Sequence, residues 1–231
     1  MYKYELHTHS RGCSACAIAE CTEIVDAAKE KGYAGIVFTN HFYRGNTSID
    51  RNLPWKDFVE AYKQDYLIAK ERGNKIGIDV IFGIEEGMGK GKEVLIYGIE
   101  ADVIAGEPNF AAMDLKMLSD FVHKNGGVIY AAHPFRQRHY IANPRQEPDL
   151  NYLDGIEVYN HGNTKEDNQY AAEYAKQKGV STISGGDVHS VGDLGTTGIA
   201  TPIRIKSSKE LVEVLKSGDY QLIIDGRKVM K

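Results

Sequence analysis

The chain has 231 residues, of which 42% are hydrophobic and 26% are charged, as is ordinary for a globular protein with a sizeable core. Its net charge of −4 argues against a general nucleic-acid or membrane-surface binder, because such proteins usually carry a basic stripe. The sequence shows no signal-peptide pattern and no run approaching 18 apolar residues, so we expect a cytoplasmic protein without membrane contacts.

Short apolar strands alternate with amphipathic helices along the whole chain. In chain order, the sequence predicts a strand at 4–7, a helix at 22–31, a strand at 35–39, a helix at 55–72, strands at 79–83 and 93–98, a helix at 111–124, strands at 128–132 and 155–159, a helix at 165–178, a strand at 182–184, a helix at 208–217 and a strand at 221–224. In the helix at 55–72, apolar residues recur at helical spacing, with Asp65 as one polar interruption. Ser207 or Ser208 can cap the last helix. Three glycines stand where helices should end, namely Gly73, Gly126 and Gly179.

This alternation predicts parallel strands joined by right-handed crossovers. The strand at 35–39 is apolar throughout, as expected when helices or other elements cover both of its faces. No linker, charge block or internal repeat divides the sequence. We therefore predict a single domain over residues 1–231 with an α/β fold, a distorted TIM-like barrel, and keep an open doubly wound sheet as the alternative.

Polar side chains follow several of the predicted strands. Residues i and i+2 of a strand point to the same face, so His7 and His9 should project side by side from the first strand. The carboxyl ends of parallel strands form one face of a barrel or an open sheet, and active sites are built there. We expect the other strand-end candidates to converge on the same pocket, namely His41, Glu85, His133, Asp187 and His189.

Imidazole and carboxylate groups in this pattern are typical ligands of zinc, manganese or iron. Taken alone, His7 and His9 could equally be two surface or core histidines, but the ligands at the other strand ends favour a metal site. A bridging carboxylate suits two or more ions a few Å apart. Glu86 should point away from Glu85, and we assign it a structural role.

The three cysteines, Cys13, Cys16 and Cys21, lie in one short segment. An odd number without an export signal favours a reducing compartment over a disulfide framework. The spacing of Cys13 and Cys16 could indicate half of a zinc or iron–sulfur knuckle, but no second cysteine pair completes four ligands. Cys16 is either a small buried residue or a metal ligand.

Five motifs together resemble the PHP (polymerase and histidinol phosphatase) superfamily of metal-dependent phosphoesterases. They occur in the order of the family and span nearly the whole chain: His7-Thr8-His9-Ser10, Thr39-Asn40-His41, Gly83-Ile84-Glu85, His133-Pro134 and Gly186-Asp187-Val188-His189-Ser190. The resemblance implies a distorted barrel of seven strands and seven helices, a (β/α)7 barrel, with two or three divalent metal ions. Members of the family are phosphatases, nucleases and polymerase-associated domains.

The resemblance also implies a ligand set. Glu85 matches the carboxylate that bridges the first and second metals, and His133 matches a ligand of the second. His41 and His189 match ligands of the third metal. The first site is matched by four residues, namely His7, His9, Glu85 and Asp187.

Three positions depart from the family pattern. The second metal usually takes a further histidine on the strand after the glutamate, and here that position falls on Glu93. The third metal often takes a His or Asp in the loop after the first motif, where Cys16 is the best-placed residue. The familiar Thr-Asp-His reads Thr39-Asn40-His41 in this chain, so Asn40 lacks the charge that would raise the basicity of its neighbours.

This ligand set predicts hydrolysis of a phosphate ester by a metal-activated water, with Glu85 and Asp187 holding the metals that activate it. Arg136 is the first candidate to grip a phosphate and Arg44 the second. The general acid for the leaving alcohol is either His189 or a metal-bound water. The expected partner is a small phosphorylated metabolite or a short nucleotide, because the chain has no added domain for gripping a long nucleic acid. The sequence predicts no oligomeric state.

Two other functions remain open at this point. A carbon–nitrogen hydrolase of the amidohydrolase type also has a barrel and a His-x-His motif, but typically relies on a strand-end lysine or carbamate bridge, which has no counterpart here. A non-catalytic metal-binding or regulatory domain is the third possibility, and the near-complete ligand set counts against it.

Overall fold

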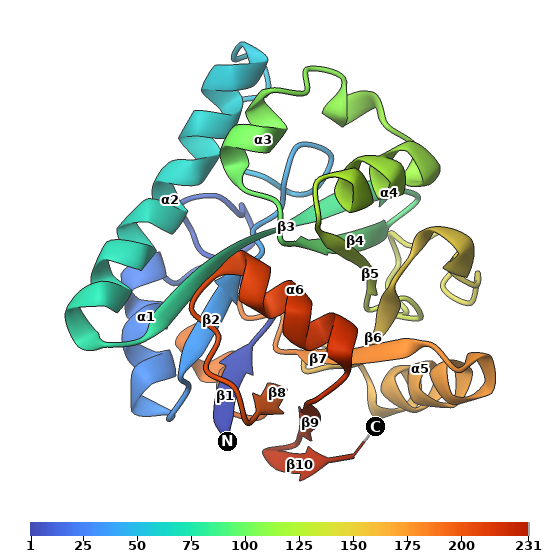
Figure 1. Cartoon of the computed structure of the whole chain (residues 1–231). Helices are drawn as coiled ribbons and strands as arrows, with labels where there is room; N and C mark the ends of the chain where they lie inside the picture. Colours follow the sequence, from blue (N-terminus) through green and yellow to red (C-terminus); the bar gives the residue numbers. More distant parts are fainter. Residues whose placement is uncertain (231) are drawn as a thin grey trace.

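The computed structural model describes residues 1–230, in which ten strands form one mixed sheet and six α-helices pack around it (Figure 1). The strands are β1 (Tyr2–Glu5), β2 (Gly35–Phe38), β3 (Asp79–Gly89), β4 (Lys92–Tyr97), β5 (Val128–Ala132), β6 (Gly155–Asn160), β7 (Ser181–Gly185), β8 (Gly198–Thr201), β9 (Gln221–Ile224) and β10 (Arg227–Val229). The α-helices are α1 (Cys21–Glu30), α2 (Trp55–Ile76), α3 (Ala101–Ala105), α4 (Leu115–Lys124), α5 (Lys165–Lys178) and α6 (Ser208–Ser217). Within the described residues, no helix combines the length and apolar character needed to cross a membrane.

The strand order is β10-β9-β8-β1-β2-β3-β4-β5-β6-β7. β1 to β3 run parallel, as do β5 to β7, whereas β4 is antiparallel to both of its neighbours. The predicted strands at 79–83 and 93–98, which have no predicted helix between them, are therefore antiparallel and not parallel. β3 continues past the predicted strand to Gly89, and the chain returns directly as β4. Three successive residues with positive φ, Gly89, Lys90 and Gly91, allow this tight reversal.

The sheet curls until its ends face each other. β7 forms a ladder with β6 only, and its other edge lies against β8 and β9, where Ser184 Oγ donates to the carbonyl of Ile223 at 2.7 Å. Apolar side chains from opposite sides of the curl, such as Leu6, Leu95 and Ile183, fill its interior and are fully buried. The predicted distorted TIM-like barrel is confirmed, and the open sheet is wrong because the two sheet ends enclose one core.

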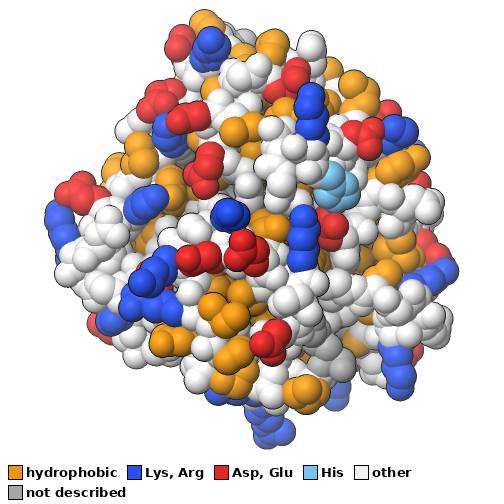
Figure 2. All heavy atoms as spheres, viewed as in Figure 1, with side chains coloured by type: hydrophobic (Ala, Val, Ile, Leu, Met, Phe, Trp, Pro, Cys, Tyr) orange, Lys and Arg blue, Asp and Glu red, His pale blue; other side chains and the backbone are white. Residues whose placement is uncertain are grey.

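One helix covers an end of this barrel. In α6, Leu211, Val212 and Leu215 join the inner core, next to the first residue of β5, Val128. Figure 1 shows α6 in front of the strands, and Figure 2 shows that basic and acidic side chains are interspersed with apolar ones on this face. The strand ends that carry the candidate ligands are at the opposite end of the barrel.

Two helices of the outer layer have boundaries that differ from the predicted ones. α2 continues past Gly73 and ends at Gly77, which adopts a left-handed φ of 74°. Gly73 instead lets the helix approach the sheet, since a Cβ there would lie 2.6 Å from Cγ2 of Val80. α4 begins at Leu115 because Asp114 caps it, accepting a hydrogen bond from a backbone N–H at 2.8 Å.

Candidate metal centre

β1 ends at Glu5, two residues before the end of the predicted strand, and His7 and His9 follow in the next segment. The N–H of His9 donates to the carbonyl of Val188 at 2.8 Å, so the segment that follows β7 lies beside the segment that follows β1. This pairing brings Asp187 and His189 to the two histidines. Asp187 has a φ of 51°, an uncommon left-handed conformation for a non-glycine residue, and such strained residues cluster at functional sites.

The predicted ligands of the first metal lie together. Nε2 of His7 is 3.0 Å from Nε2 of His9 and 3.3 Å from Oε1 of Glu85. Nε2 of His9 is 3.1 Å from Oδ1 of Asp187. His133 approaches from the end of β5 and places its Nε2 3.0 Å from Oε1 of Glu85. Glu85 thus lies between the first group and His133, where a bridging carboxylate would have to lie.

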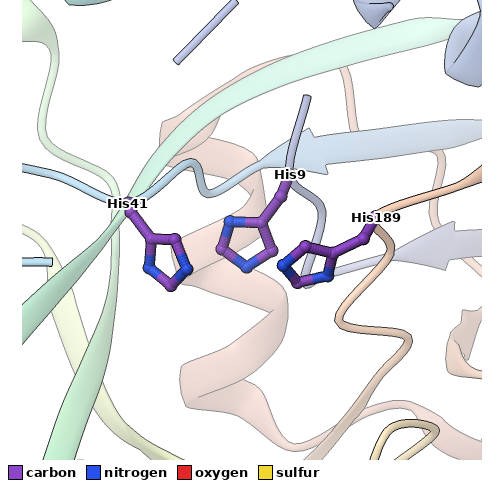
Figure 3. Close-up of side chains that lie close together, drawn as sticks. All are labelled: His9, His41 and His189. Atoms are coloured by element: carbon purple, nitrogen blue, oxygen red, sulfur yellow. The ribbon is translucent and has the colours of Figure 1, made fainter. Parts of the chain in front are cut away.

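Three histidines form a neighbouring group, in which His9 lies between His41 and His189 (Figure 3). The ring centroid of His9 is 4.4 Å from that of His41 and 4.5 Å from that of His189. Cys16, on the loop before α1, adds a sulfur atom, since its Sγ lies 3.1 Å from Nε2 of His189. The structure therefore brings together the residues predicted for the third metal.

Glu93 lies at the start of β4 and reaches into the same space. Its carboxylate oxygens are 3.5 Å from Nδ1 of His41 and 3.6 Å from Nε2 of His133. Cys13 does not share this surrounding, because its buried Sγ donates to the carbonyl of Tyr62 at 3.2 Å. The two cysteines thus point to different partners, and the knuckle interpretation is wrong.

The donor atoms of this set fit divalent cations. Nδ1 of His7 faces Oε1 of Glu157 at 2.9 Å, and because a carboxylate only accepts, the neutral ring presents the lone pair of Nε2 to the ligand group. Nδ1 of His41 and Oε2 of Glu85 are buried and 2.8 Å apart, yet their geometry gives neither a hydrogen bond. Buried polar atoms without a hydrogen bond are rare, and nitrogen and carboxylate donors together suit zinc, manganese or iron.

The electrostatics of the site attract positive charge. Burial disfavours a charged His7, but Glu157, Asp187 and Glu85 outweigh it and raise the pKa of His7 well above its usual value. Burial and the proximity of His41 lower the pKa of His9 to about 3. His9 is therefore neutral at physiological pH and already in the form that binds a metal ion.

The two most exposed acidic candidates shift in opposite directions. Burial and Glu85 raise the pKa of Glu93 to about 8. Burial would also raise the pKa of the Cys16 thiol, but hydrogen bonds with His189 and His41 prevail and lower it to about 6. The histidines thus favour the thiolate, the form in which cysteine binds metals.

The two arginine candidates differ in position. Arg136 is buried beside the candidate ligands, where its Nη2 donates to Asp187 and, at 2.7 Å, to Oδ1 of Asn160. Arg44 donates to the buried Glu86 at 2.7 Å, on the face of β3 opposite to Glu85. Glu86 therefore has the predicted structural role, whereas Arg44 is directed away from the ligand group and cannot grip a phosphate held there.

Two buried carboxylates that the sequence did not point to organise the candidate ligands. Glu157 on β6 holds His7 through Nδ1 and accepts from the N–H of His133 at 2.9 Å. Glu5 on β1 accepts from the N–H groups of His7, at 3.1 Å, and Gly186, at 2.7 Å. Glu157 stands between Ile156 and Val158 in β6, and a charged residue between two apolar ones was a signal that could have found it. Glu5 ends β1, which also contains Lys3, and gave no such signal.

Fold and site together define an α/β barrel protein whose histidine, glutamate and aspartate clusters, at the carboxyl ends of its strands, are suited to divalent metals. The family model of the PHP domain matches residues 5–217. The chain belongs to the PHP domain family, whose members include metal-dependent phosphoesterases, and the predicted resemblance is confirmed.

Several known proteins are similar to this chain in sequence or in fold. It is 32% identical over 114 residues to the PolC-type DNA polymerase III of Thermotoga maritima, an alignment that spans 49% of this chain and 7% of the polymerase. A two-domain protein of Bacteroides vulgatus, described as containing a predicted PHP-like metal-dependent phosphoesterase, has the same fold with a TM-score of 0.70 and 19% identity, over 98% of this chain and 66% of that one. An amidohydrolase from Chromobacterium violaceum, solved with sulfate and no metal, matches 92% of this chain and 96% of its own with a TM-score of 0.60 and 16% identity.

Proposed function

We propose that this protein is a metal-dependent phosphoesterase that hydrolyses a phosphate ester of a small metabolite or a short nucleotide. The observation that carries the proposal is the overlap of the ligand groups. His9 belongs both to the group with His7 and Glu85 and to the group with His41 and His189. Shared ligands would hold cations side by side, and adjacent cations suit the attacking and leaving oxygens of a phosphoryl transfer.

The ligand assignment follows these groups. We assign Glu85 as the bridge between the first two ions, and His133 and Glu93 to the second. Cys16 and His41 would hold a third ion together with His189. The first ion would be held by His7, His9, Glu85 and Asp187.

Bound divalent ions would supply Lewis acidity, which lowers the pKa of water and stabilises negative charge on phosphoryl oxygens. The chain itself supplies orientation. Glu157 holds the ring of His7, and Arg136 holds Asp187 through Nη2. Nη1 of Arg136 remains as the atom that could donate to a phosphate oxygen.

His189 has one nitrogen for two predicted roles. Its Nδ1 faces the carbonyl of Asp187 at 2.7 Å, so Nδ1 carries a proton. Nε2 then either binds a third ion or holds the proton that protonates the leaving oxygen, and it cannot do both. An enzyme with three ions bound would use His189 as a ligand, and an enzyme with two would use it as the general acid.

The screen for the substrate class has two parts. The chain's likeness to a segment of a DNA polymerase makes short nucleotides one part of the screen, and sugar phosphates and histidinol phosphate form the other.

The three free cysteines support a cytoplasmic setting, because that compartment keeps thiols reduced.

Metal analysis combined with a substrate screen tests the proposal. Protein loaded with zinc or manganese should bind two or three ions per chain and release phosphate from at least one phosphorylated substrate. Glu85→Ala and Asp187→Ala should lose both metal and turnover, whereas Asp219→Ala, on the exposed turn after α6, should keep both. Absence of metal binding in the unaltered chain, or full activity in the Glu85→Ala variant, would overturn the proposal.

The same screen separates two other functions. Turnover of amides without phosphate release would identify a carbon–nitrogen hydrolase, the activity in the description of the structural relative from Chromobacterium violaceum. Tight metal binding without turnover of either panel would indicate a non-catalytic or regulatory domain.

A further inference from the structure

Asp65 is a buried carboxylate that the proposed chemistry does not use. It lies on α2, in the helix face that packs on the sheet, and is 7% exposed. In the described part of the chain, no lysine, arginine or histidine forms an ion pair with it. A buried charge without a counter-charge is costly, so hydrogen-bond donors must stabilise this carboxylate.

The hydrogen bonds of Asp65 lead toward the metal centre. Its Oδ2 accepts from the hydroxyl of Ser10 and, at 3.4 Å, from Nδ2 of Asn40. The other end of the Asn40 amide is an acceptor, because the N–H of Ser10 donates to Oδ1 at 2.7 Å. The amide therefore has its donor toward Asp65 and its acceptor toward the ligand group.

Ser14 continues this series to a metal ligand. Its hydroxyl donates to Oδ1 of Asn40 at 2.9 Å and, having one proton, can only accept its other bonds. Those bonds come from the N–H of His41, at 3.0 Å, and from Nδ1 of His9, at 3.1 Å. His9 thus carries its proton on Nδ1, and the lone pair of its Nε2 is directed into the space between His7 and Asp187 where a cation could lie.

We propose that Asp65 is a positioning residue for the metal centre and serves as the remote carboxylate partner of His9. All hydrogen bonds of the series run in one direction, from the imidazole through Ser14 and Asn40 to the anion. Hydrogen bonds in such a chain polarise one another, so the carboxylate holds the tautomer of His9 and raises the electron density at Nε2. Glu157 does the same for His7 by direct contact, and such partners normally orient metal-ligating histidines.

A substitution and its reversal test this role. Asp65→Asn removes the anion, and we expect the dissociation constant for zinc to rise about tenfold or more, as for other outer-shell partners. In Asn40→Asp/Asp65→Asn, the carboxylate and the amide change places, so position 40 still accepts from Ser10 and Ser14. We expect zinc affinity within about threefold of the unaltered chain for this double variant. Asp57→Asn, an exposed change on the same helix, should bind zinc as the unaltered chain does.

Nitrogen chemical shifts of the histidines in the metal-free protein give an independent readout. His9 should be in the Nδ1–H form in the unaltered chain and in the double variant, and should populate the other tautomer in Asp65→Asn. A purely structural role would instead lower the unfolding midpoint of the metal-free protein and leave the zinc affinity unchanged. That result, or a double variant that binds zinc as weakly as Asp65→Asn or fails to fold, overturns the proposal.

The proposal rests on the proposed metal centre, and the two can fail separately. An unaltered chain that binds no zinc overturns both. An unaltered chain that binds zinc, with an Asp65→Asn variant that binds it equally tightly, overturns only the role of Asp65.

Discussion

Glu157→Gln should weaken metal binding by about tenfold to a hundredfold, the usual effect of removing the carboxylate partner of a ligating histidine. One carboxylate oxygen accepts from Nδ1 of His7, and the other from the N–H of His133 and Nδ2 of Asn160, each at 2.9 Å. A glutamine has only one oxygen. Its NH2 group must face either Nδ1 of His7 or the two donors on the other side. In the first case Nδ1 accepts, and Nε2 carries the proton instead of a lone pair for the metal.

Two independent magnitudes for the metal-binding free energy lost in Glu157→Gln agree. Tenfold to a hundredfold in affinity corresponds to about 1.4 to 2.8 kcal/mol. Loss of one hydrogen bond to a charged group independently costs about 1.5 to 3 kcal/mol. Because Glu157 and His7 are almost completely buried, water cannot replace the lost partner, and we do not expect solvent to reduce this value.

A zinc titration against a chromophoric chelator measures the effect in metal-free protein at neutral pH. Glu213→Gln, an exposed change on α6, provides the matched control and should leave the affinity unchanged. If folded Glu157→Gln protein binds zinc as tightly as the unaltered chain, then the orientation of His7 by Glu157 does not contribute to the metal centre, and the reasoning is refuted.

Three further changes test other parts of the structure. In cobalt-loaded protein, Cys16→Ser should abolish a thiolate-to-metal charge-transfer band that Cys13→Ser retains. If the band survives in Cys16→Ser, Cys16 is not the sulfur ligand. The pKa of Glu93 is raised to about 8 from an ordinary 4.5, so the folded metal-free protein holds a proton there that the unfolded chain releases, and its stability should fall as pH rises through this window. Glu93→Gln should flatten that dependence in urea titrations, and an unchanged slope would contradict it. Gly198→Ala should cost about 3 kcal/mol of unfolding free energy, because φ is 110° and a Cβ would lie 2.0 Å from a β1 carbonyl oxygen. Gly179→Ala changes a helix end with open space around it and should cost only about 1 kcal/mol. Equal losses of unfolding free energy in the two variants would refute the steric argument.

The grouping of the candidate ligands could be predicted to a large extent because most of these residues follow strands. His7, His9, His133 and Asp187 each stand where a parallel strand ends, and the topology of such sheets brings strand ends together. Glu93 was harder to place, since β4 is antiparallel and its beginning, not its end, lies at the site. Only the resemblance to the family pattern indicated the position of Glu93.

The supporting residues could not be predicted, because their roles depend on side-chain contacts between distant segments. Asp65 looked like a polar interruption on an apolar helix face, yet its partners, Ser10 and Asn40, come from two other parts of the chain. The loss of charge at Asn40 was visible in the sequence. The carboxylate that α2 supplies next to Asn40 becomes apparent only when α2 is packed against the sheet.

The position of β7 has a consequence for how the barrel holds together. This strand has a ladder on one side only, yet Asp187 and His189, just beyond it, meet His7 and His9 from β1. Any cation held by both pairs would cross-link the first and seventh strands and act as a clasp on the open side of the cylinder. Amide hydrogen exchange in β7 should then slow more on metal loading than exchange in β2, which is paired on both sides.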